Sequence, residues 1–105
     1  MDIVFHAHHA NVSDYMRRRA EAALRRLARR ADRPVDGVIR FEQDSGVRRV
    51  ELTLHASGRR YVAHSEGRFF GTLLADALRR LSVQLAHNKR PLRARAQRRR
   101  TISAR

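Results

Sequence analysis

The sequence predicts a single α+β domain with the element order β-α-β-β-β-α, in which two helices pack on one face of a four-stranded sheet. Three observations predict this fold. The N-terminal segment alternates apolar and polar residues, two longer segments repeat apolar residues at helical spacing, and three strand-like segments joined by short turns lie between them. A chain of 105 residues is long enough for one modest core.

The first strand and the first helix are predicted from the N-terminal third of the chain. "DIVFHAH", residues 2–8, alternates as a half-buried strand does. Ser13 is a suitable N-cap, and Asp14 places a negative charge where the helix dipole favours it. The sequence Asp32-Arg33-Pro34 is predicted to end this helix. Its apolar stripe consists of Met16, Ala20, Ala23, Leu24, Leu27 and Ala31.

Three further strands are predicted in the middle of the chain. They are "GVIRFEQ", "VRRVELTLHA" and "RRYVAHSE", and the turns between them are "DSG" and Ser57-Gly58. Turns this short require an antiparallel meander. The first strand needs a right-handed crossover through the first helix to pair in parallel with the second strand. Both helices then cover one face of the sheet and leave the other face to water.

A second amphipathic helix is predicted from about residue 69 to residue 87, and Pro91 is expected to block its continuation. Residues 1–90 then form the folded domain. Residues 91–105 are predicted to be a basic, disordered tail, because residues 89–105 hold eight basic residues and no acidic one. The helix's apolar side consists of Phe70, Leu73, Leu74, Ala77, Leu78, Leu81 and Leu85.

The charge balance predicts an anionic partner. The chain has 24 Lys and Arg against 10 Asp and Glu, a formal charge of +14, which favours nucleic acid over an acidic membrane. It contains no cysteine, so disulfides and thiolate metal sites are excluded. No signal peptide and no membrane-spanning run is recognisable, and we therefore expect a cytoplasmic protein without a membrane partner.

The first helix carries the densest positive charge. Its segment "RRRAEAALRRLARR" holds seven arginines in fourteen residues, and only Glu21 offsets them. A solvated face usually mixes both signs, so this face favours binding to nucleic acid. The second helix, with Arg79, Arg80 and Asp76, is less one-sided. The arginines opposite the apolar stripe of the first helix are Arg18, Arg19, Arg25, Arg26, Arg29 and Arg30.

The histidines leave two less favoured alternatives open. His6, His8, His55 and His64 are predicted to lie on the open side of the sheet, where they suit a wetted polar surface. A metal site needs three or four converging ligands, and acid–base cleavage of RNA needs a positioning group beside the histidines. We therefore predict a protein that is not an enzyme and has no metal or cofactor, with a histidine-based or metal-dependent RNA-processing enzyme as the alternative.

Structured RNA is the class of nucleic acid that fits best. The helix-turn-helix, zinc ligands and basic zipper of sequence-specific DNA readers are missing, so no DNA specificity is expected. There is no Trp, and the six aromatic residues are expected to be mostly buried, which argues against base stacking. What remains is recognition of phosphate geometry by arginine-rich helices.

The segments "NVSDYMRRRAEAALRRL", "VAHSEGRFF" and "LLADALRRLSVQLAHNK", together with the element order, resemble the ribosome hibernation-promoting factor family, also called ribosome-associated translation inhibitors or sigma-factor modulation proteins. The resemblance covers about residues 1–90. It implies binding to rRNA of the small ribosomal subunit in the channel of mRNA and the tRNAs, which inhibits translation and preserves idle ribosomes during stress or stationary phase. The RNA-binding positions it implies are Arg18, Arg25, Arg26, Arg29, Arg79, Arg80, Lys89 and Arg90.

The chain departs from this family at the start of the second helix. Family members place an acidic residue, an aromatic residue and a small-aliphatic-acid triplet there, where this sequence has Phe69, Gly71 and "LLA". The C-terminal dimerisation domain of long members has no counterpart in these residues, so the resemblance implies a short form without a dimerisation domain of its own. A general structured-RNA-binding protein, or RNA chaperone, is the alternative function.

Overall fold

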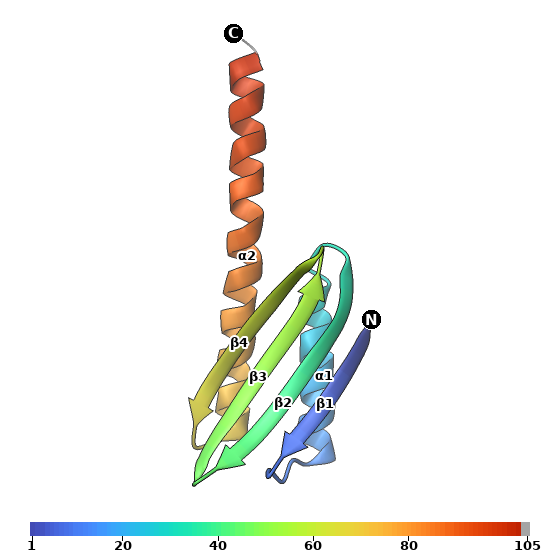
Figure 1. The fold of residues 1–105 in the computed structure, drawn as a ribbon, viewed down its shortest axis with the longest axis vertical. Helices are drawn as coiled ribbons and strands as arrows, with labels where there is room; N and C mark the ends of the chain where they lie inside the picture. Colours follow the sequence, from blue (N-terminus) through green and yellow to red (C-terminus); the bar gives the residue numbers. More distant parts are fainter. Residues whose placement is uncertain (104–105) are drawn as a thin grey trace.

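The six elements follow one another in the predicted order, and the predicted fold class is confirmed (Figure 1). The computed structural model describes the backbone of residues 1–103 and the side chains of residues 1–88. The four strands form one sheet in the order β1-β2-β3-β4, with β1 parallel to β2 and the other pairs antiparallel. The elements are β1 (Asp2–His8), α1 (Asp14–Ala28), β2 (Pro34–Asp44), β3 (Val47–Ala56), β4 (Arg59–Gly67) and α2 (Phe70–Ser103).

Two Ser-Gly turns fix the meander. Ser45 and Gly46 join β2 to β3, and Ser57 and Gly58 join β3 to β4, with positive φ angles of 50°, 79°, 51° and 70° in that order. Positive φ at both central residues is the signature of the type I′ turn, whose twist matches that of the flanking strands. Each turn therefore sets the register of its hairpin, which runs without a shift from Asp44↔Val47 to Asp36↔His55 in the first.

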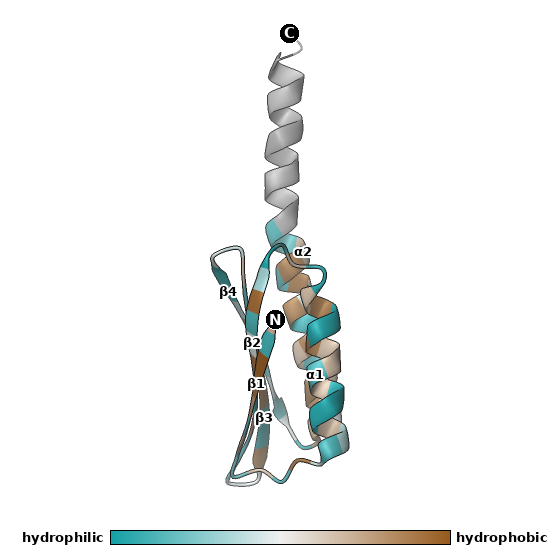
Figure 2. Cartoon of the chain, turned by 90° about the vertical axis from the view of Figure 1, so that its right-hand side faces the viewer, coloured by the Kyte–Doolittle hydropathy of each residue, from teal (hydrophilic) through white to brown (hydrophobic). Residues whose placement is uncertain are grey.

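The core lies between the sheet and the two helices, which cover the same face of the sheet (Figure 2). At Gly37 in β2, an added Cβ would lie 2.9 Å from Leu24 Cδ2, so the buried Leu24 side chain packs directly on this glycine and would have to shift to admit a larger residue. The fully buried large side chains come from every layer and are Leu24, Ile39, Phe41, Val50, Leu52, Leu54, Leu74 and Leu81.

The start of α1 is as predicted, and its end is earlier. Ser13 Oγ accepts a hydrogen bond from the Met16 backbone N–H at 3.1 Å, which confirms the predicted N-cap. The helix ends at Ala28, before the predicted stop at residues 32–34. Arg33 takes a left-handed backbone conformation, with φ of 48°, and turns the chain into β2.

The predicted end of the second helix is wrong, because α2 continues past Pro91 to Ser103. A proline removes one backbone hydrogen bond, but the Arg, Ala, Leu and Gln that surround it are strong helix formers. The side chains beyond residue 88 lie outside the described residues, and the prediction of a basic, disordered tail at residues 91–105 stays a prediction. Among the described residues, no helix combines the length and the apolar character needed to cross a membrane.

Candidate nucleic-acid interface

The face of α1 that points away from the sheet is an exposed arginine surface. The five arginines of α1 and the two that follow it, Arg29 and Arg30, are all exposed, whereas Ala20, Leu24, Leu27 and Ala28 on the opposite side are buried. Like charges this close raise the free energy of the unbound protein unless an anion is bound. The arginines that form no hydrogen bond or ion pair with the described residues are Arg18, Arg19, Arg26 and Arg29.

Part of this surface borders α2. Arg19 and Arg26 line a groove of about 320 Å³ whose other walls include Leu74, Ala75 and Leu78 of α2. Further along, Arg30 donates a hydrogen bond of 2.6 Å to Ser82 Oγ and links the two helices. The groove therefore combines apolar side chains with two arginines, and these arginines can contact phosphates of a nucleic-acid backbone.

The other side of α1 faces β1. Arg25 donates a 2.8 Å hydrogen bond to the Met1 carbonyl. Arg17 forms an ion pair with Glu21 at 3.2 Å, and its guanidinium lies over the Phe5 ring, 5.2 Å from the centroid. Arg25, which the resemblance implies as an RNA-binding residue, is thus held by the N-terminus, while Arg18, Arg26 and Arg29 are free to bind.

The two predicted arginines of α2 lie apart from the groove. Arg79 donates to Asp76 Oδ1 at 2.8 Å, and Arg80 Nε lies 3.0 Å from Asp76 Oδ2. The hydrogen bonds that Arg79 and Ser65 donate, together with the charge of Arg80, hold the pKa of the Asp76 carboxyl below its usual value. The side chains of Lys89 and Arg90 lie outside the described residues.

Side chains of α2 also bind the outer edge of β4. Arg80 donates to the His64 carbonyl at 3.0 Å and Gln84 to the Val62 carbonyl at 2.6 Å, while Ser65 Oγ donates to Asp76 at 2.9 Å. Carbonyls two residues apart on an edge strand point the same way, so two side chains one turn apart on α2 reach them. This seam fixes the position of α2 relative to the sheet.

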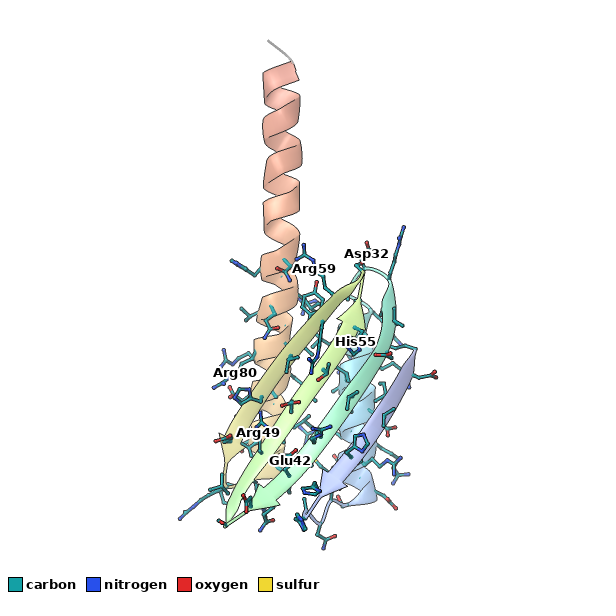
Figure 3. The ribbon with its side chains drawn as sticks, viewed as in Figure 1. Asp32, Glu42, Arg49, His55, Arg59 and Arg80 are labelled. Carbon is teal, nitrogen blue, oxygen red and sulfur yellow. The ribbon has the colours of Figure 1, made fainter. Side chains whose placement is uncertain are left out.

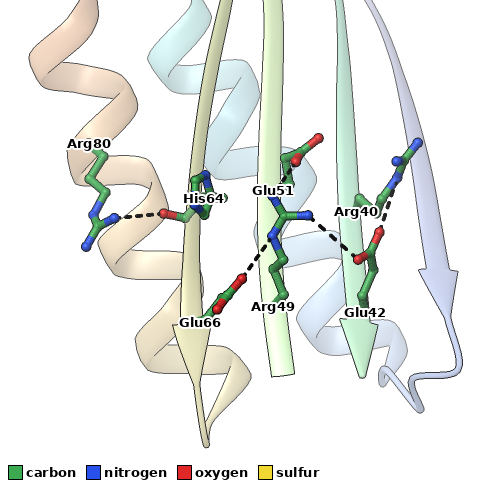
Figure 4. A network of polar contacts seen from close by, with 7 residues as sticks. All are labelled: Arg40, Glu42, Arg49, Glu51, His64, Glu66 and Arg80. Carbon is green, nitrogen blue, oxygen red and sulfur yellow. Dashed lines mark hydrogen bonds and ion pairs between the residues drawn. The ribbon is translucent and has the colours of Figure 1, made fainter. Parts of the chain in front are cut away.

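The open face of the sheet has a different electrostatic character (Figure 3). The guanidinium of Arg49 lies between three carboxylates, at 2.9 Å from Glu51, 3.5 Å from Glu66 and 3.8 Å from Glu42 (Figure 4). Its Nε forms no hydrogen bond of good geometry, so the contact with Glu66 is an ion pair only. Six of the ten acidic residues fall on this face by strand register, at Asp2, Asp36, Glu42, Asp44, Glu51 and Glu66.

The predicted histidines lie on this open face, but they do not converge. His6 and His64 share a cross-strand row in which Arg40 and Glu51 separate them. His55 forms a hydrogen bond with Asp36. Within residues 1–88, no group of three or more His, Asp or Glu is placed to hold a metal ion.

Two features of the surface were missed by the sequence prediction. Arg19 was counted among the arginines of the arc but not among the binding residues, although its angular position beside Arg26 on the helix would have placed it. The aromatic residues were expected to be mostly buried, but Tyr15 and Phe69 are 68% and 66% exposed. Both stand next to a helix start, where no apolar periodicity distinguishes an exposed ring from a buried one.

Comparisons with known proteins find similarity in structure alone. No protein-family model and no curated protein sequence matches the chain. A ribosomal subunit interface protein from Coxiella burnetii superposes with a TM-score of 0.73 and 18% identity, covering 85% of this chain and 98% of that one. The Protein Y N-terminal domain of Thermus thermophilus superposes with a TM-score of 0.69 and 21% identity, covering 81% of this chain and 96% of that one. The chain therefore has the fold of these two proteins, in agreement with the fold that the sequence resemblance implies.

Proposed function

We propose that this protein binds the small ribosomal subunit through the helix face and occupies the channel of mRNA and the tRNAs, so that translation stops and idle ribosomes are preserved. The observation that carries the proposal is a set of exposed arginines with no partner among the described residues, in a fold shared with a ribosomal subunit interface protein. Arg18, Arg26 and Arg29, with Arg19 from the groove, contact rRNA phosphates. The protein acts in the cytoplasm during stress or stationary phase.

Charge on the two faces supports this orientation. Arginines bound to phosphate release counterions. Arg18, Arg26 and Arg29 are available for this because no carboxylate among the described residues neutralises them, whereas Arg17 is paired with Glu21. The open sheet face holds carboxylates next to its arginines, and these repel phosphate. Arg79 and Arg80 contribute less, since Asp76 already binds both guanidinium groups. Binding by charge and shape requires no catalytic group, so we propose a binding factor and not an enzyme.

The test is a double charge reversal on each face. Arg26→Glu with Arg29→Glu should weaken binding to purified small subunits by about a hundredfold or more, because two phosphate contacts become repulsions. The control is Arg40→Glu with Arg60→Glu, which makes the same change in charge on the open sheet face and should leave affinity within about twofold. Each phosphate contact that is lost should flatten the salt dependence by a slope of about 0.7 to 0.9.

Equal losses from both double variants would contradict binding through the helix face. A general RNA chaperone is separated by a competition: it would bind free structured RNA as tightly as it binds small subunits. A translation assay then tests the inhibition itself, because a factor in the mRNA channel must lower peptide synthesis in proportion to the occupied subunits.

A further inference from the structure

Both helices begin at the same end of the molecule (Figure 1). A second groove is lined by residues of this end. Its volume is about 340 Å³, and we call it the Phe69 pocket. Its walls come from three parts of the chain: the loop before α1 together with the first turn of that helix, the start of β3, and the start of α2 with the residue before it. The side chains that matter below are Asn11, Met16, Arg48, Phe69 and Phe70.

Phe69 is unfavourable for the fold in two ways. It immediately precedes α2, at the position where Ser, Thr, Asp or Asn would accept a hydrogen bond from the free N–H groups of the first turn. A phenyl ring has no oxygen to do so, and the first turn of α2 contains no acidic residue. Phe69 is also 66% exposed as a residue. By contrast, α1 begins with the capping hydroxyl of Ser13.

Such a residue is expected where function outweighs local stability. A single exposed aromatic on a protein surface needs no explanation by itself. Phe69, however, borders a groove, and beside it the guanidinium of Arg48 lies 4.9 Å from the centroid of the Phe70 ring. The groove thus combines an exposed ring, a cation, and the amide of Asn11, which both donates and accepts hydrogen bonds.

We propose that the Phe69 pocket receives one unpaired base of the bound RNA, which stacks on the Phe69 ring while Arg48 faces its phosphate. This inference rests on the proposed function for the identity of the ligand as RNA. A base offers a flat π-surface for the ring and polar edges for Asn11. No carboxylate lines the pocket among the described side chains, so its charge favours a nucleotide over a neutral apolar peptide.

The pocket lies beside the proposed phosphate contacts. Met16, on its wall, immediately precedes the arginines 17–19 in the first turns of α1. An RNA strand along the arginine surface therefore reaches the pocket without crossing the open sheet face. Phosphate contacts along α1 are insensitive to sequence, and a base in the pocket would add a contact that only single-stranded or bulged RNA can make.

The chain contains no Trp, so a tryptophan at position 69 is a unique fluorescent reporter. Phe69→Trp should keep wild-type affinity for small subunits, and its emission should be quenched when they bind, because bases quench a stacked indole. Tyr15→Trp is the matched control, since Tyr15 is equally exposed but does not line the pocket. Single-stranded oligoadenylate should quench the first reporter, and the same oligomer without bases should not.

Replacing Phe69 by serine should raise the thermal stability of the protein and lower its affinity for small subunits. Phe69→Ser supplies a cap, so the thermal midpoint should rise, yet affinity for small subunits should fall by roughly tenfold with an unchanged salt slope, because a base contact and no phosphate contact is lost. Phe69→Leu should lose as much affinity for small subunits, because leucine offers no ring for a base to stack on. Full affinity in Phe69→Leu would mean that an apolar protein segment occupies the pocket, and full affinity in Phe69→Ser would overturn the proposal.

The outcomes also separate this inference from the proposed function. If reversal at Arg26 and Arg29 abolishes binding while Phe69→Ser does not, the helix face binds RNA and the Phe69 pocket does not. If wild-type protein fails to bind small subunits, the proposed function fails. The oligoadenylate titration of Phe69→Trp then still decides the pocket: base-dependent quenching supports a base site, and equal quenching by both oligomers overturns it.

Discussion

The two faces of this small protein handle arginine in opposite ways. On α1, Arg18, Arg26 and Arg29 have no partner among the described residues, and the charge that they carry opposes folding. On the open face of the sheet, Arg49 is surrounded by carboxylates of three strands. Arginine is therefore available to bind a ligand on one face, and on the other face it forms ion pairs that connect neighbouring strands. Composition alone, with its high positive charge, does not distinguish these roles.

One hydrophobic core positions both faces of the molecule. Truncation of a side chain in that core should therefore have the largest effect on stability. Leu81 is completely buried between α2 and the sheet. Leu81→Ala should lower the free energy of unfolding by about 2–4 kcal/mol, measured by urea denaturation. Val83 is 58% exposed on the same helix, so Val83→Ala should change it by less than about 0.5 kcal/mol. Similar losses from both would contradict the assigned core.

Neutralising one arginine on each face should change the stability of the protein in opposite directions. Arg49→Met leaves three carboxylates facing one another on neighbouring strands, which should destabilise the protein by about 1 kcal/mol. Added salt should restore most of that loss. Arg26→Met removes a repelling charge and should hold or raise the urea midpoint. If Arg26→Met destabilises the protein as much as Arg49→Met, the arginines of α1 have structural partners and the contrast between the faces is lost.

The smallest effect concerns Asp76, which ties Arg79 and Arg80 of α2. Because its pKa is lowered in the folded state, its contribution to stability is present above the ordinary aspartate value of about 4 and is lost as the pH falls through the folded value. The difference in thermal midpoint between wild type and Asp76→Asn should therefore be present at pH 7 and vanish in strong acid. Asp32→Asn is the control, because the Asp32 carboxylate forms no ion pair with the described side chains.

The elements of the fold could be predicted from local patterns. Alternation in β3, the Ser57-Gly58 turn and the Ser13 cap each depend on residues a few positions apart, and each is confirmed. The end of α2 was predicted wrongly because a single proline was given more weight than the helix propensity around it.

The site could be predicted only in part. The arginine surface follows from helical geometry, so its existence is visible in the sequence. Its division into residues that border α2 and residues that face β1 is not, because that depends on where α1 lies relative to its neighbours. The binding of Arg80 to the β4 edge and the exposure of Phe69 likewise depend on how α2 is placed on the sheet.

The seam between α2 and β4 also covers part of an exposed sheet edge. Arg80 and Gln84 occupy carbonyls that an edge strand would otherwise offer to a strand of another molecule. If α2 lifts from the sheet, a hydrophobic surface and a template for intermolecular strand pairing are uncovered together. Aggregation on storage or heating should therefore follow local detachment of this helix, at temperatures below the global transition. Substitutions that strengthen the seam should therefore slow aggregation without changing the arginine surface.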